Sequence, residues 1–162
     1  MSAPRIPKVR DPSAPGMAGA SPSPQRVAVI GASGYGGLQI LRLLQDHPGF
    51  RVTFLGGSGS VGQHWNDRAP FLPLPGNPAI EEPSPEAIAA AADVAVLSLP
   101  NGLASGLAPA LLRAGVRVVD LSADYRFPTV AQWAATYTGE AERHPRHDDD
   151  LCAEAEIGRA HV

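Results

Sequence analysis

The sequence predicts an α/β fold built on a doubly wound, mostly parallel sheet. Short apolar runs typical of buried strands alternate with segments of helical period, and turns rich in glycine or proline separate them. The chain has 162 residues, which is enough for one domain with its own core but too short for two large ones. Hydrophobic residues make up 44% of it and charged residues 18%, as in ordinary globular proteins.

The first half of the chain predicts two clear strands and a helix. Residues 27–30 form an apolar run, as expected of a parallel strand buried on both faces. Apolar residues then recur at helical spacing over 38–44 and stop at a His-Pro-Gly sequence, and residues 51–55 predict the second strand. Residues 70–85 contain six prolines and predict a loop, with a short strand around 79–81.

The second half predicts two more helices and two more strands. Ser84, followed by a proline and a glutamate, is typical of a helix N-cap, and the alanine-rich run behind it predicts the helix. Residues 93–99 and 116–121 predict strands. Between them Asn101 is the expected N-cap of a helix that ends at Gly115.

A glycine-rich turn, G-A-S-G-Y-G-G, joins the first strand to the first helix over residues 31–37. Gly31 permits a tight turn, Gly34 lets the backbone approach a pyrophosphate, and Gly37 lets the helix pack closely. The helix N-terminus offers N–H groups and a positive dipole end to phosphates, and Ser33 adds a hydroxyl donor. The turn indicates a Rossmann-type dinucleotide-binding fold. The alternative is a tight turn that binds nothing.

The end of the second predicted strand bears on which dinucleotide binds. Folds specific for NAD usually place an acidic residue there to hold the ribose 2′-hydroxyl. Residues 55–60 contain no acid, and Ser58 and Ser60 could hydrogen-bond a 2′-phosphate. The nearest basic residue further on is Arg68. The pattern favours NADP over NAD, and the alternative is a flexible glycine-serine loop.

Charge and cysteine content exclude several function classes. The 13 basic and 16 acidic residues give a net charge of −3, which offers no basic excess for nucleic acid or an anionic membrane. A single cysteine favours a reducing, cytoplasmic location. Cys152 follows three aspartates that disfavour a thiolate, so we do not expect it to be catalytic. His144 and His147 beside the same aspartates predict a solvated loop rather than a metal site.

Several segments together resemble one enzyme family. The turn over 31–37 is similar to the nucleotide loop of semialdehyde dehydrogenases. The S-L-P-N-G-L-A stretch over 98–104 and the V-V-D-L-S-A-D-Y-R stretch over 118–126 resemble N-acetyl-γ-glutamyl-phosphate reductases, as do Y-T-G at 137–139 and the following His-Pro at 144–145. The resemblance covers about residues 26 to 145.

The resemblance implies a two-domain NADPH-dependent reductase of arginine biosynthesis. A cysteine of the second domain would attack an acyl phosphate, and hydride transfer to the thioester would release a semialdehyde. That cysteine's turn is absent here, so no catalytic residue is assigned. Arg126 would contact a substrate carboxylate or phosphate, the alternative being an ion pair with Asp120 or Asp124. The implied cofactor-binding residues are Gly31, Ser33, Gly34, Tyr35, Gly36, Gly37, Ser58, Pro100 and Asn101.

The predicted organisation has three parts. Residues 1–24 are interpreted as a disordered leader rich in proline and serine, the alternative being that Met17 is the true start and the first 16 residues are a mis-called extension. Residues 25–156 are interpreted as an NADP-binding domain that is incomplete at its C-terminal end. Residues 157–162 are interpreted as a non-native tail, because one back-translation of them looks like a sequencing adapter. We expect the full-length protein to act on a small molecule and to form homo-oligomers. The alternatives are a LysW-linked aminoadipyl-phosphate reductase, another semialdehyde dehydrogenase, or a stand-alone NADP-binding module.

Overall fold

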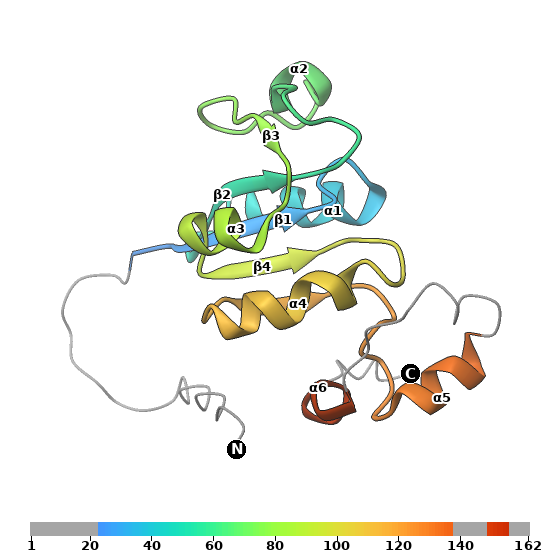
Figure 1. Ribbon diagram of the computed structural model, residues 1–162. Helices are drawn as coiled ribbons and strands as arrows, with labels where there is room; N and C mark the ends of the chain where they lie inside the picture. Colours follow the sequence, from blue (N-terminus) through green and yellow to red (C-terminus); the bar gives the residue numbers. More distant parts are fainter. Residues whose placement is uncertain (1–22, 138–148, 156–162) are drawn as a thin grey trace.

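The computed structural model describes residues 23–137 and 149–155 and confirms the α/β class. Five strands form one sheet in the order β3-β2-β1-β4-β5, and every pairing between them is parallel (Figure 1). The strands are β1 (Gln25–Ile30), β2 (Phe50–Gly56), β3 (Ile80–Glu81), β4 (Val94–Leu97) and β5 (Arg117–Asp120). The helices are α1 (Tyr35–Leu44), α2 (Trp65–Arg68), α3 (Pro85–Ala91), α4 (Ala104–Arg113), α5 (Val130–Thr136) and α6 (Asp149–Glu154).

Two hydrophobic cores lie on opposite faces of the sheet because side chains alternate along each strand. Val27 and Val29 of β1 pack with α1 and with the segment around Trp65 of α2. Ala28 and Ile30, the alternate residues of β1, pack with α3 and α4. Helices therefore cover both faces of the sheet, as the doubly wound arrangement requires (Figure 1).

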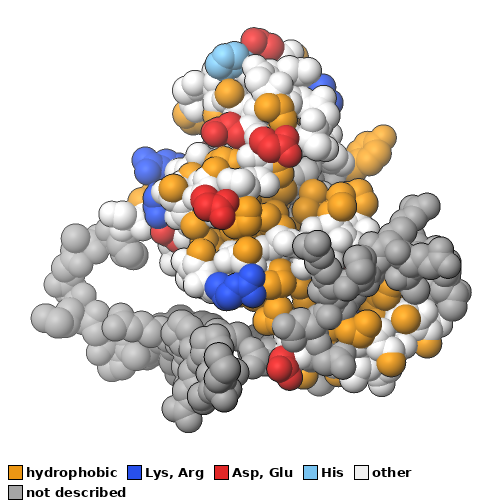
Figure 2. Space-filling model, viewed as in Figure 1, with side chains coloured by type: hydrophobic (Ala, Val, Ile, Leu, Met, Phe, Trp, Pro, Cys, Tyr) orange, Lys and Arg blue, Asp and Glu red, His pale blue; other side chains and the backbone are white. Residues whose placement is uncertain are grey.

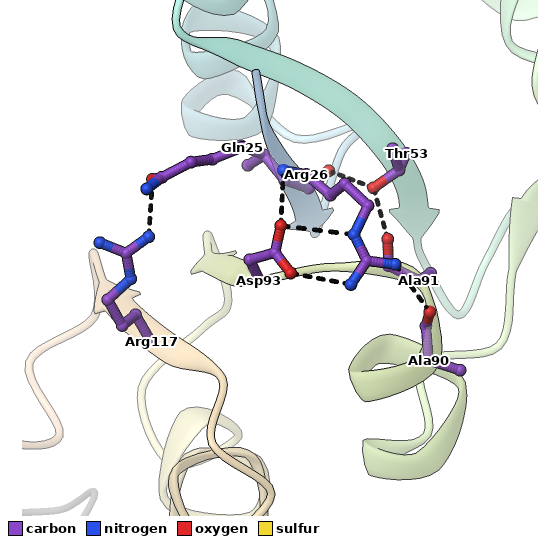
Figure 3. Close-up of polar contacts among 8 residues, drawn as sticks. Gln25, Arg26, Thr53, Ala90, Ala91, Asp93 and Arg117 are labelled. Carbon is purple, nitrogen blue, oxygen red and sulfur yellow. Dashed lines mark hydrogen bonds and ion pairs between the residues drawn. The ribbon is translucent and has the colours of Figure 1, made fainter. Parts of the chain in front are cut away.

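A polar cluster joins the amino ends of the strands (Figure 3). The Arg26 guanidinium donates to both carboxylate oxygens of Asp93, with Nη2–Oδ1 at 2.8 Å and Nε–Oδ2 at 3.3 Å, and to the Ala90 carbonyl at 3.0 Å. These hydrogen bonds hold the pKa of the Asp93 carboxyl below its usual value. Arg117 donates to Gln25 at 2.6 Å, so β1 is tied both to β4 and to β5 at this end.

The edge of the sheet formed by β5 exposes apolar side chains to solvent. Val119 and Leu121, which lie on and just after the edge strand β5, are 48% and 45% exposed. Figure 2 shows apolar side chains gathered over the middle of one face, with arginines at separate points around them. None of the helices in the described ranges is both long and apolar enough to cross a bilayer.

Most predicted elements are confirmed, and the local ones best. Ser84 caps α3, because its Oγ accepts a hydrogen bond from the Ala87 N–H at 3.1 Å. The strand predicted over 93–99 is shorter and ends at Leu97. The four-residue α2 was not predicted. The predicted leader and tail lie outside the described residues, apart from residues 23 and 24, and so do His144 and His147.

The prediction that Asn101 is the N-cap of α4 is wrong. The N-cap position is Leu103, which makes no side-chain cap. The Asn101 Oδ1 instead accepts a hydrogen bond from the Ala123 N–H at 3.0 Å. The first turn of α4 is capped from the loop after β5, where the Asp124 carboxylate accepts from the backbone N–H of Ser105 at 2.9 Å.

Candidate functional site

The candidate site lies at the carboxyl ends of β1, the central strand of the sheet, and of its neighbour β4. The strand order changes direction between them, since β2 and β3 extend to one side and β4 and β5 to the other. In open parallel sheets, ligands bind in the crevice outside such a switch point. The expected crevice would lie between the turn after β1 and the loop after β4, which follow the ends of these two paired strands (Figure 1).

Two glycines of the turn, Gly31 and Gly37, are required by the protein's own packing. Gly31 has φ +80°, and a Cβ on it would lie 2.1 Å from the Ser98 carbonyl oxygen. A Cβ on Gly36 would lie 2.5 Å from the Ser98 Oγ, and one on Gly37 would lie 2.3 Å from the Gly31 oxygen. The segment just after β4 thus lies against the turn, and only glycine fits at positions 31 and 37, where backbone atoms are in the way; at position 36 rotation of the Ser98 hydroxyl would make room. The tight turn predicted at Gly31 and the close helix packing predicted at Gly37 agree with this geometry.

Gly34 differs from the other glycines of the turn. It is exposed, and a Cβ on it would meet only the Gly31 oxygen, at 3.4 Å. Its backbone is extended, with φ −79° and ψ 166°, which any residue can adopt. Packing within the protein does not require a glycine here. A close approach by a ligand, as predicted for a pyrophosphate, does supply a reason.

The N-terminus of α1 fits an anionic group. Gly34 occupies the N-cap without a side-chain cap, and the first turn of α1 contains no acidic residue. The N–H groups of Tyr35, Gly36 and Gly37 begin the helix, so helix geometry gives them no acceptor within it. The positive end of the helix dipole therefore meets the crevice without a compensating carboxylate. The Tyr35 side chain is 93% exposed beside it.

The loop after β2 contains the two serines that were predicted near the adenosine ribose, and only one of them is accessible. Ser58 is exposed, whereas Ser60 is 3% exposed and thus belongs to the interior rather than to a ligand site. The Arg68 Nη1 donates to Gln63 Oε1 at 3.4 Å. Glu81 of β3 lies in register with Gly56. That carboxylate is next to the strand end in space, although spacing along the chain gave no sign of it.

Two polar loops meet on the β4 side of the crevice. Asn101 lies after β4 and Asp124 after β5, and each bonds the backbone of the other loop. Asp120 accepts from the N–H and Oγ of Ser122 at 2.9 and 2.8 Å, and burial raises the pKa of the Asp120 carboxyl. Sequence reasoning missed the role of Asp124, because its partners lie 19 and 22 residues away.

Arg126 does not form the ion pair considered as the alternative. Its Nη1 donates to the Tyr137 hydroxyl at 3.0 Å and its Nη2 to the Ser122 carbonyl at 3.5 Å, and the side chain is exposed. The Asp124 carboxylate is engaged by backbone N–H groups instead. Cys152 lies on α6 with only 2% of its surface exposed, so a substrate cannot reach its sulfur in this conformation.

An all-parallel sheet of this order, with a glycine turn and an uncapped helix N-terminus at the switch point, has the features of a dinucleotide-binding oxidoreductase domain. The family model for the semialdehyde dehydrogenase NAD binding domain matches residues 26–148. The chain belongs to the semialdehyde dehydrogenase family, and the match lies in its NAD-binding domain.

Known proteins refine this assignment. The chain is 61% identical over 133 residues to the N-acetyl-gamma-glutamyl-phosphate reductase of Parasynechococcus marenigrum (strain WH8102) and 59% identical to that of Synechococcus sp. (strain CC9605). Each match covers 82% of this chain and 37% of the relative, so the chain spans little more than a third of these relatives. The sequence resemblance to this family is confirmed.

Solved structures agree on the fold. Aspartate semialdehyde dehydrogenase with NADP from Candida albicans aligns with a TM-score of 0.57 and 30% identity, covering 64% of this chain and 31% of that one. Aspartate semialdehyde dehydrogenase II from Vibrio cholerae aligns with a TM-score of 0.51 and 25% identity, covering 64% and 30%. Both are less similar in sequence than the reductases above.

Proposed function

We propose that this chain is the NADP-binding part of a reductase that converts N-acetyl-γ-glutamyl phosphate to N-acetylglutamate semialdehyde and phosphate in arginine biosynthesis. The 61% identity to a reductase of that name, over 82% of the chain, carries the proposal. Aspartate semialdehyde dehydrogenases share the fold at 30% identity or less in the matches described above, which favours the N-acetyl-γ-glutamyl substrate over aspartyl phosphate.

The turn after β1 is proposed to hold the pyrophosphate. Gly34 leaves room for close approach, the N-terminus of α1 supplies N–H donors, and Ser33 and the exposed Tyr35 border the same place. Gly31, Gly36 and Gly37 contribute by shaping the turn. Across the crevice, Pro100 and Asn101 are proposed to lie beside the nicotinamide.

NADP is the proposed cofactor rather than NAD. Residues 55–60 at the end of β2 offer an exposed Ser58 and no carboxylate to repel a 2′-phosphate. The structurally similar aspartate semialdehyde dehydrogenase from Candida albicans was solved with NADP. Glu81 lies beside the end of β2, and its carboxylate would repel the 2′-phosphate of NADP if it turned toward the ribose. The choice between NADP and NAD therefore has to be measured by titration with both nucleotides.

The chemistry divides between this chain and the rest of the enzyme. Bound NADPH would supply the hydride that reduces a thioester. The nucleophilic thiol is proposed to come from outside this chain, because Cys152 is buried on α6. Arg126, exposed in the loop after β5, is proposed to contact an anionic group of the substrate. The full-length enzyme is proposed to be a cytoplasmic homo-oligomer.

A domain exchange tests the substrate. Residues 26–148 would replace the corresponding part of the Parasynechococcus marenigrum reductase, which the 61% identity makes feasible. The chimera should catalyse the phosphate-dependent reduction of NADP⁺ with N-acetylglutamate semialdehyde, and a chimera with Gly34→Ala should lose most of this activity. A folded chimera that binds NADPH but is inactive on that substrate would contradict the proposed reaction.

A further inference from the structure

We propose that Asp124 is a positioning residue that sets the loop over 100–103 for the nicotinamide half of the cofactor. The inference rests on the proposed function, because it assigns a role within the same cofactor site. Asp124 is 0% exposed, so its carboxylate cannot touch a ligand in the crevice. Any effect on cofactor binding must pass through the backbone that the carboxylate holds.

The carboxylate of Asp124 holds the loop after β4 at two points. It accepts hydrogen bonds from the N–H of Gly102 at 2.6 Å and from the N–H of Ser105 at 2.9 Å. The Ser105 Oγ also donates to the Gly102 carbonyl at 2.9 Å. Gly102 has φ +94°, a conformation that glycine adopts readily and other residues rarely, so the loop passes between its two attachment points at a glycine.

A second tie runs in the opposite direction. The Asn101 Oδ1 accepts from the Ala123 N–H, and the Asp124 N–H donates to the Ser122 Oγ at 3.0 Å. Each loop thus caps the backbone of the other, and the loops after β4 and β5 behave as one unit. The Trp133 indole adds a donor to the Ala123 carbonyl at 2.8 Å, which anchors the β5 side to α5.

The origin of this cap argues for positioning rather than stability alone. Helices are usually capped by a Ser, Thr, Asp or Asn at the N-cap itself, which needs no contact between loops. Here the N-cap is Leu103, and the carboxylate comes from 19 to 22 residues away. A remote cap fixes the place of the loop relative to β5, which a local cap does not.

The N-termini of α1 and α4 differ in whether a side chain already occupies them. The N-terminus of α1 has no side-chain cap and is open to a phosphate, whereas the first turn of α4 is closed by Asp124. The adenosine side of a dinucleotide lies toward the end of β2, so the loop after β4 faces the other half. Disturbing Asp124 should therefore weaken contacts to nicotinamide and spare those to adenosine and pyrophosphate.

The test compares two ligands on the full 162-residue chain. NADPH and 2′-phospho-ADP-ribose share the adenosine phosphate and the pyrophosphate, and only NADPH has the nicotinamide. In Asp124→Asn one oxygen becomes an NH₂ group, which cannot accept from the second N–H. We expect NADPH affinity to fall about tenfold, the scale of one lost hydrogen bond to a charged group, with 2′-phospho-ADP-ribose changed less than twofold.

A matched control and a second variant complete the experiment. Asp120→Asn makes the same change from carboxylate to amide in the same segment but leaves the Gly102 and Ser105 N–H groups paired with Asp124, so both affinities should stay unchanged. Equal loss for both ligands in Asp124→Asn, or loss for neither, would overturn the inference. If Asp124→Asn does not fold, Ser105→Ala removes only the hydroxyl tie and should weaken NADPH alone; an equal effect on both ligands would again overturn it. A folded wild-type chain that binds neither ligand would refute the proposed cofactor site itself.

Discussion

Replacing Gly34 by alanine should separate cofactor binding from folding. The new Cβ meets only the Gly31 oxygen at 3.4 Å, and φ −79° suits an L-residue. Alanine is a poorer N-cap than glycine, by up to about 1 kcal/mol. The smaller entropy of the unfolded chain returns about 0.4–1 kcal/mol. The free energy of unfolding should therefore change by less than about 1 kcal/mol.

The same methyl group should weaken NADPH binding strongly. It stands at the exposed mouth of the turn, where the pyrophosphate is proposed to approach the backbone. Moving a phosphate away from one N–H donor costs about 1.5–3 kcal/mol, which is a loss of about 10- to 150-fold in affinity. Isothermal titration with NADPH measures this loss directly.

Gly31→Ala is the matched comparison. Its φ of +80° costs an alanine about 1–2 kcal/mol, and a Cβ at 2.1 Å from the Ser98 carbonyl forces backbone to move. We expect a loss of at least about 3 kcal/mol of unfolding free energy in urea titration. The reasoning is refuted if Gly34→Ala is as destabilising as Gly31→Ala, or if it binds NADPH like the wild type.

Other predictions concern the scaffold. Because Arg26 lowers the pKa of Asp93, their pairing stabilises the fold above the unfolded pKa of Asp93 and is lost as pH falls through the folded pKa. The urea midpoint of Arg26→Met should therefore lie further below that of wild type at neutral pH than at low pH, and a deficit that does not change with pH contradicts this. Because burial raises the pKa of Asp120, the folded state binds its proton more tightly, and stability from this group is lost as pH rises through the folded pKa; Asp120→Asn should gain stability relative to wild type from acid to neutral pH, and a constant difference across that range argues against it. Trp65 is 0% exposed and its Nε1 donates to the Leu72 carbonyl at 2.8 Å, so Trp65→Ala should cost about 3–5 kcal/mol by chemical denaturation, and a cost under about 1 kcal/mol contradicts the packing described.

Local signals in the sequence predicted the fold well. The Ser84 cap, the tight turn at Gly31 and the close packing at Gly37 each depend on residues near in the chain, and residue type reveals them. The parallel sheet with helices on both faces followed from the alternation of strands and helices together with the glycine turn, whereas the strand order itself was not predicted. The four-residue α2 is too short to show a helical period.

Contacts between distant segments were beyond sequence reasoning. The close approach of Ser98, which follows β4, to Gly31 and Gly36 was not predicted. Asn101 was predicted to be a helix N-cap because of its residue type, yet its Oδ1 accepts a hydrogen bond from the Ala123 N–H in the loop after β5. The Asp124 carboxylate, in the loop after β5, accepts a hydrogen bond from the Ser105 N–H in the first turn of α4. Residue types suggested these groups, but only the three-dimensional arrangement decides which partners they meet.

Titration of the purified chain with NADPH and NADH, after a cooperative melt has shown it to be folded, tests the central claim most directly. The account predicts saturable binding of NADPH, at least about tenfold tighter than NADH, as expected when a 2′-phosphate gains charge-assisted hydrogen bonds. Tighter binding of NADH would contradict the choice of cofactor. A folded chain that binds neither nucleotide would contradict the claim that this is a cofactor-binding domain.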